Sequence, residues 1–149
     1  MAKQTFQGRP VVGGDIDGEA LVSKQPFNTT SSYIDNIWGG NTKSAPCTDQ
    51  DNPELYKKDL SGVILCTPQT IGSSMGGACF MAVAGLGVAP KAILFSRHID
   101  GVGASGIVMA NVWQEKPIVT IDLLGDEFLK AVKTGDPISI KADGTVEVG

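Results

Sequence analysis

The stretch that decides the fold is TPQTIGSSMGGACFMAVAGLG, residues 67–87. It follows an apolar run, residues 62–66, that is typical of a buried strand, and residues 74–86 are predicted to form a helix ended by Gly87. Gly72, two serines and two further glycines lie at the junction of the strand and the helix. In an open α/β sheet, such a turn faces the binding crevice. The stretch therefore predicts a parallel sheet with a turn of small residues at its binding edge.

The rest of the chain extends this pattern in both directions. Short strands joined by glycine turns are predicted over 6–23, strands over 92–96 and 117–121, helices over 104–111 and 125–132, and a hairpin over 137–148. Strands that alternate with helices indicate a parallel sheet, and strands at both ends indicate a second β layer closed by the two termini. We predict an α/β fold, a three-layer β/β/α domain that spans residues 1–149 as a single unit.

A long polar connection, residues 24–59, interrupts this alternation and shows little periodicity. A connection of this length is usually disordered or functional. It contains the large apolar residues Phe27, Tyr33, Ile37 and Trp38. We therefore expect part of it to pack against the domain or to meet a partner.

The composition excludes several classes of function. The net charge is −4 and the lysines and arginines do not cluster, so no nucleic-acid partner is expected. No apolar run approaches the ~18–20 residues of a membrane span, so no membrane partner is expected either. The first ten residues lack the apolar centre of a signal peptide, which predicts a cytoplasmic protein.

The three cysteines do not form a pattern with metal-ligand spacing. Cys66 and Cys79 lie in apolar runs and are expected to be small buried residues, whereas Cys47 lies in the polar connection and is less constrained. The chain alone is therefore not expected to hold a metal.

The turn at Gly72 allows two interpretations. A helix N-terminus carries free N–H groups that suit a carboxylate or phosphate, and one serine can cap the helix while the other meets a ligand. Alternatively, the segment is only a cap with closely packed glycines. It is neither a Walker motif, since no lysine follows, nor a nucleophile elbow. His98 is the single histidine and is more typical of a surface position than of a Ser–His–Asp triad.

Several motifs, taken in order, resemble the small subunit of the aconitase X family. They are GGDIDGEALVS at 13–23, Pro26-Phe27, WGG at 38–40, GSS at 72–74 and GVAPKAI at 87–93. The resemblance implies a swivelling β/β/α domain like the fourth domain of aconitase. It also implies a large-subunit partner that holds an iron centre or an iron–sulfur cluster of the 2Fe–2S type.

The resemblance also implies a site and an activity, a hydro-lyase (dehydratase) acting on a small hydroxy acid. Ser73 would be the catalytic base, held as an alkoxide, with Gly72, Ser74, Gly76 and Gly77 around it to bind substrate. Aconitase has an arginine two positions after its serine, where this chain has Met75, which argues against a tricarboxylate substrate. Arg97 is a possible substitute.

Two substrates are open within this family, cis-3-hydroxy-L-proline, which gives Δ1-pyrroline-2-carboxylate, and (R)-5-phosphomevalonate. The chain is rich in Asn, Gln, Thr and Gly and poor in Glu/Lys pairs, unlike hyperthermophile proteins, which favours a bacterial member and hence hydroxyproline. Two rival hypotheses are a non-catalytic carrier that is phosphorylated on His98 and a structural subunit whose partner performs all the chemistry.

Overall fold

The structure, a computed structural model, describes residues 2–149. Its strands are β1 (Gln4–Gln7), β2 (Arg9–Val12), β3 (Ile16–Val22), β4 (Phe27–Asn28), β5 (Ile64–Thr67), β6 (Thr70–Ile71), β7 (Ala92–Phe95), β8 (Val119–Asp122), β9 (Pro137–Ile140) and β10 (Thr145–Val148). Its helices are α1 (Thr29–Ser32), α2 (Ile34–Ile37), α3 (Gly76–Gly85), α4 (Gly101–Trp113) and α5 (Asp126–Ala131).

The main sheet has the strand order β1-β10-β9-β3-β5-β7-β8-β2. Its centre, from β3 through β5 and β7 to β8, is parallel, as the alternation of strands and helices predicted. On one side, β1, β10, β9 and β3 pair antiparallel, so the two ends of the chain close the second β layer. β2 adds an antiparallel edge beside β8, where Arg9 pairs with the buried carboxylate of Asp122 at 2.6 Å.

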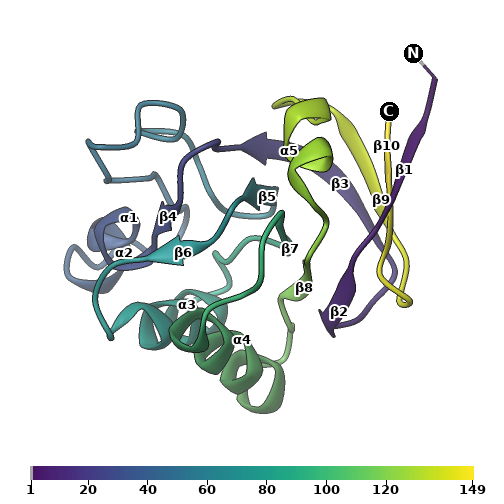
Figure 1. Ribbon diagram of the computed structural model, residues 1–149. Coiled ribbons are helices and arrows are strands. Elements are labelled where there is room, and N and C mark those ends of the chain that lie inside the picture. The colour runs from purple at the N-terminus through teal and green to yellow at the C-terminus, as the bar shows by residue number, and fades with distance from the viewer. Residues whose placement is uncertain (1) are drawn as a thin grey trace.

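Three layers result, and the predicted β/β/α architecture is confirmed. Every residue of β5, β7 and β8 is buried, because both faces of these strands are covered. Successive residues face opposite layers: Leu65 and Phe95 pack toward α3 and α4, whereas Cys66 packs toward the terminal strands and α5. Figure 1 shows α3 and α4 together on one side of these central strands and β1, β9 and β10 on the other.

The polar connection over 24–59 is built into the fold and is not disordered. It contains β4, α1 and α2, and β4 pairs in parallel with β6. Phe27 and Tyr33 are fully buried and form an aromatic cluster with Phe80 of α3, with ring centroids 5.9–6.4 Å apart. The prediction that part of this segment packs down is confirmed, although Trp38 remains 58% exposed.

The remainder of the connection folds without regular structure because side chains close its turns. Asp59 accepts hydrogen bonds from the backbone N–H groups of Ala45 and Ser61, and a β-bridge joins Pro46 to Asp59. Asn52 is buried and donates to the hydroxyl of Ser23 at 2.9 Å. Asx turns of this kind leave no hydrophobic period, so periodicity could not reveal them.

The helices and strands predicted from the sequence occur in the predicted order in the structure, but their boundaries differ. The predicted helix over 104–111 begins earlier, at Gly101, because the Asp100 carboxylate accepts the Gly103 N–H and caps it. The helix predicted over 74–86 spans Gly76–Gly85. Within residues 2–149, no helix is both long and apolar enough to cross a membrane.

Candidate functional site

The turn between β6 and α3 is wholly on the surface. Each residue from Ile71 to Met75 is exposed, whereas Gly76 and Gly77 are buried. Gly72 has φ +107°, a conformation that side-chain-bearing residues rarely adopt, and a Cβ there would lie 2.5 Å from the Asn28 side-chain oxygen. Glycine is therefore required at this position for the chain to turn out of β6 and present the two serines.

Ser73 is the serine that binds the start of the helix. Its hydroxyl oxygen accepts a hydrogen bond from the Met75 N–H at 3.0 Å, and its carbonyl accepts one from the Gly76 N–H at 2.9 Å. The side chain of Ser74 forms no hydrogen bond with residues 2–149. Sequence reasoning assigned one serine to capping and one to chemistry. In the structure of residues 2–149, α3 has no side-chain N-cap, and the hydrogen bond before its first turn goes to Ser73, where the Met75 N–H favours negative charge on the hydroxyl oxygen.

Asp100 joins this turn to the beginning of α4. Thr70, the first residue of β6, donates its hydroxyl to one Asp100 oxygen, and the other oxygen accepts the Gly103 N–H at 3.0 Å. Next to Thr70, Gln69 donates its side-chain amide to the His98 carbonyl at 2.8 Å. The end of the chain segment that leads into the serine turn, including β6, is therefore hydrogen-bonded to the loop that precedes α4.

Gly77 lies at the contact between α3 and α4. A Cβ on it would lie 2.6 Å from the Ser105 hydroxyl and 2.7 Å from the Val102 carbonyl, and a Cβ on Gly106 would overlap the Gly77 carbonyl. A Cβ on Gly76 would make only ordinary contacts, with Thr29 and Val102. Close helix packing thus explains Gly77, and its predicted part in substrate binding is not needed to account for the residue.

Arg97, considered as a substitute for the arginine absent at Met75, lines a hollow beside α5 that includes no residue of the serine turn. Met75 is 46% exposed. Arg97 follows β7 and is exposed. It lines a hollow with residues of α5, on the opposite side of the sheet from α3 and α4.

His98 is exposed, as expected for a surface position, and its carbonyl accepts the Gln69 amide. It lies two residues before Asp100, and the Asp100 carboxylate already accepts the Gly103 N–H at the start of α4. The geometry gives no support to a phosphohistidine carrier.

All three cysteines are buried free thiols. The interpretation of Cys66 and Cys79 as buried core residues is confirmed. Cys47, which the polar surroundings left unconstrained, is only 1% exposed and belongs to the same core as Tyr33. Burial raises the pKa of each thiol. Among residues 2–149, no three His, Cys, Asp or Glu side chains come together in a metal-binding group, so the donors described here do not fit an iron centre.

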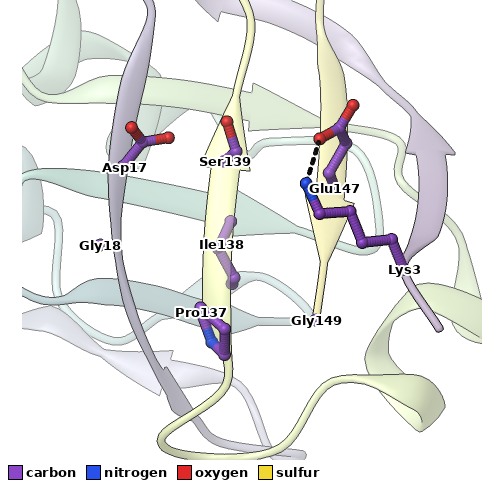
Figure 2. A pocket seen from close by; sticks show the side chains of 8 residues that line it. All are labelled: Lys3, Asp17, Gly18, Pro137, Ile138, Ser139, Glu147 and Gly149. Atoms are coloured by element: carbon purple, nitrogen blue, oxygen red, sulfur yellow. Dashed lines mark ion pairs between the residues drawn. The ribbon is translucent and has the colours of Figure 1, made fainter. Parts of the chain in front are cut away.

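A separate hollow lies on the terminal β layer, remote in the fold from the serine turn (Figure 2). Its lining includes Asp17 of β3, Ser139 of β9 and Glu147 of β10, and Lys3 pairs with Glu147 across 3.7 Å. None of its residues comes from the segment 67–77. This hollow therefore does not contribute to the candidate site.

These features define a class of protein, a β/β/α domain that carries an exposed serine turn at the carboxyl edge of a parallel sheet. Residues 5–148 match the model of the aconitase X swivel domain, and the chain belongs to that family.

Similarity to named proteins also supports membership of this family. The chain is 33% identical over 144 residues to the phosphomevalonate dehydratase small subunit of Archaeoglobus fulgidus, covering 96% of this chain and 97% of that one. It is 32% identical to the protein of the same name from Thermococcus gammatolerans, covering 96% of each chain. A crystal structure of Thermococcus kodakaraensis aconitase X in its holo-form superposes with a TM-score of 0.81 at 26% identity, covering 98% of each chain.

Proposed function

We propose that this chain is the small subunit of a two-subunit aconitase X-type hydro-lyase that dehydrates phosphomevalonate, with Ser73 as its catalytic base. The observation that carries this proposal is the turn in which Ser73 accepts the Met75 N–H, and in which each residue from Ile71 to Met75 is exposed to water. A serine is a useful base only as an alkoxide sheltered from solvent. The exposed turn would therefore act only when a partner covers it.

The proposed partner is a large subunit, since the relatives are named as small subunits. An iron or iron–sulfur cluster, which the donors of this chain do not fit, belongs in this proposal to that large subunit and would polarise the departing hydroxyl there. This chain would contribute the base and the N–H groups around it.

The step assigned to Ser73 is removal of a proton from the carbon next to the one that bears the hydroxyl. The electron pair of the broken C–H bond forms the carbon–carbon double bond as the hydroxyl leaves, and Ser73 becomes a neutral alcohol. The N–H of Met75 donates to the Ser73 oxygen and would stabilise its charge before the transfer. Ser74, exposed and without a hydrogen bond to residues 2–149, remains available to bind a substrate oxygen.

The names of the relatives favour phosphomevalonate, which is the second of the two substrates considered from the sequence. The preference for cis-3-hydroxy-L-proline came from amino-acid composition, and none of the relatives described above carries that name. Composition reflects the growth temperature of the organism more directly than it reflects the pocket. The assay should therefore offer both substrates.

The test reconstitutes the complex from this chain and its large subunit and follows the dehydration of each substrate. Wild-type complex is expected to turn over phosphomevalonate, and either chain alone to be inactive. Ser73→Ala should lower kcat by about 10²- to 10⁴-fold, the usual contribution of a general base. Ser74→Ala should act mainly on KM. Ser139→Ala, on β9 in the hollow of Figure 2, is the matched control and should retain full activity.

Two results would contradict the proposal. If the Ser73→Ala complex turns over at the wild-type rate, the base lies elsewhere and this chain is a structural subunit. If the wild-type complex dehydrates cis-3-hydroxy-L-proline and leaves phosphomevalonate unchanged, the assigned substrate is wrong.

A further inference from the structure

A second hollow lies at the carboxyl edge of the parallel strands, the edge that also carries the serine turn. Its volume is about 260 Å³. It is lined by Lys24, which follows β3, by Pro68, which follows β5, by Ser96 and Arg97, which follow β7, and by Asp126, Leu129 and Lys130 of α5. Ligands of open α/β sheets bind at this edge. The volume is below the about 300–1,000 Å³ typical of sites for whole drug-sized ligands, so it suits one group of a small molecule.

The lining is cationic in a chain whose net charge is negative. Three of its side chains, Lys24, Arg97 and Lys130, are positive, and Asp126 is negative. Neither Lys24 nor Arg97 forms a side-chain ion pair with any residue of 2–149, and Lys130 pairs only with the exposed Glu127 at 3.3 Å. Lys24 and Arg97 therefore leave two positive charges at this hollow without an ion-pair partner in the described part of the chain, against the one negative charge of Asp126.

Ser96 supplies the second observation, which is independent of charge. It is 4% exposed, and its hydroxyl has no hydrogen-bond partner within residues 2–149. Its backbone is already satisfied, because its N–H donates to the Thr67 carbonyl and its carbonyl accepts the Gly125 N–H. A buried hydroxyl left without a partner destabilises a protein. An oxygen atom of a ligand in the hollow that Ser96 lines would remove that cost.

We propose that this hollow binds a phosphoryl group, with Arg97, Lys24 and Lys130 neutralising its charge and Ser96 donating a hydrogen bond to one of its oxygens. A phosphoryl group carries a charge of about −1.5 to −2 near neutral pH and has three acceptor oxygens, which matches three cations and one hydroxyl. The guanidinium of Arg97 can bind two of these oxygens at once.

The group has two possible sources, the substrate itself and a separate phosphorylated small molecule. The substrate is favoured because Pro68, which lines the hollow, and Ser73 belong to the same short connection between β5 and α3. This assignment of the source rests on the proposed function. The phosphoryl site itself does not depend on the proposed function, because it is inferred from the residues that line the hollow.

The first experiment titrates inorganic phosphate into the full chain without the large subunit and follows backbone amide signals by NMR. Saturable shifts at Ser96 and Arg97 are expected. Arg97→Gln should weaken the binding about tenfold, and Ser96→Ala should weaken it while leaving the melting temperature unchanged or higher. Lys141→Gln, which removes the same charge from the exposed end of the hairpin, is the matched control and should bind like wild type.

Shifts that do not saturate, or equal affinity in wild type and Arg97→Gln, would overturn the site. A loss of stability in Ser96→Ala would show that its hydroxyl has a structural role, and would remove it from the site. None of these readouts depends on turnover, so they stand even if the complex has another activity.

The second experiment identifies the source in the reconstituted complex. If the site holds the phosphoryl group of the substrate, Arg97→Gln should raise KM for phosphomevalonate about tenfold with little change in kcat, unlike Ser73→Ala. If KM is unchanged while phosphate still binds the isolated chain, the site takes a separate phosphorylated molecule and the assignment to substrate is wrong.

Discussion

At the scale of single residues, the site depends on a glycine that is required for its backbone. Gly72 combines φ +107° with a Cβ position 2.5 Å from the Asn28 side-chain oxygen, and that oxygen also accepts the Ser31 N–H at the start of α1. A side chain at position 72 would therefore strain its own backbone and disturb the Asn28 cap. Glycine at position 72 avoids both problems and allows the turn that places Ser73 in solvent.

Replacing Gly72 with alanine should accordingly lower the free energy of unfolding by about 2 kcal/mol and reduce activity of the complex. Gly62→Ala separates the two causes, since Gly62 also has positive φ, +69°, but has no atom within 4 Å of its Cβ position. We expect this control to cost about 1 kcal/mol and to leave activity unchanged. Urea denaturation measures both variants. Equal stability of Gly72→Ala and wild type would contradict the strained turn.

At the scale of elements, α3 and α4 approach so closely that backbone touches backbone. Gly77 on α3 and Gly106 on α4 face each other, with no space for a Cβ on either. The position of α3 sets the position of the turn that precedes it, which carries Ser73. The contact between these two helices therefore determines the geometry of the proposed base as well as the packing of one layer.

Gly106→Ala should push the helices apart and destabilise the chain by about 3 kcal/mol, at the upper end of the usual cost of overpacking, because the added carbon meets backbone that cannot rotate away. Gly101→Ala, at the first residue of the same helix, has nothing within 4 Å of its Cβ position and should be neutral or stabilising by up to about 1 kcal/mol. Thermal and urea unfolding compare the two. A Gly106→Ala chain as stable as Gly101→Ala would show that the helices are not in this contact.

At the scale of the whole molecule, the burial of the three cysteine thiols shows how tightly the layers pack against one another. Cys66 lies between the central sheet and the terminal β layer, whereas Cys47, in the polar connection, and Cys79, on α3, belong to the other core cluster. Each is at most 1% exposed, and burial raises the pKa of each above the reference value of 9.0. None can react as a thiolate until its layer opens.

We therefore expect iodoacetamide to leave the native chain unmodified at pH 8 and to alkylate all three cysteines once urea unfolds it. A raised pKa also links stability to pH: unfolded thiols ionise near pH 9 while the native ones stay protonated. Their contribution to stability is full below pH 9 and is lost as the pH rises through the native values. Urea denaturation between pH 8 and pH 10 measures this. Rapid native alkylation of Cys47 would mean that the segment following α2 opens on its own.

The regular part of the fold was predictable because each element carries its own pattern. The strands β5, β7 and β8 are apolar runs bounded by turns, and α3 and α4 follow them at the expected places. The segment 24–59 was not predictable in this way. Its core residues, such as Tyr33 and Leu55, are spaced irregularly along the chain. Its turns are closed by asparagine and aspartate side chains, which produce no hydrophobic periodicity in the sequence.

The same division holds for the candidate site. The sequence by itself determined that a Gly-Ser-Ser turn joins a parallel strand to a helix, because local residue types dictate where strands end and helices begin. Only the tertiary structure decided that Ser73 binds the helix start, that Gly77 serves helix packing, and that Lys24, Ser96, Arg97 and Lys130 share one hollow. These residues lie up to about one hundred positions apart in the chain. Sheet pairing brings them together, and no local pattern records it.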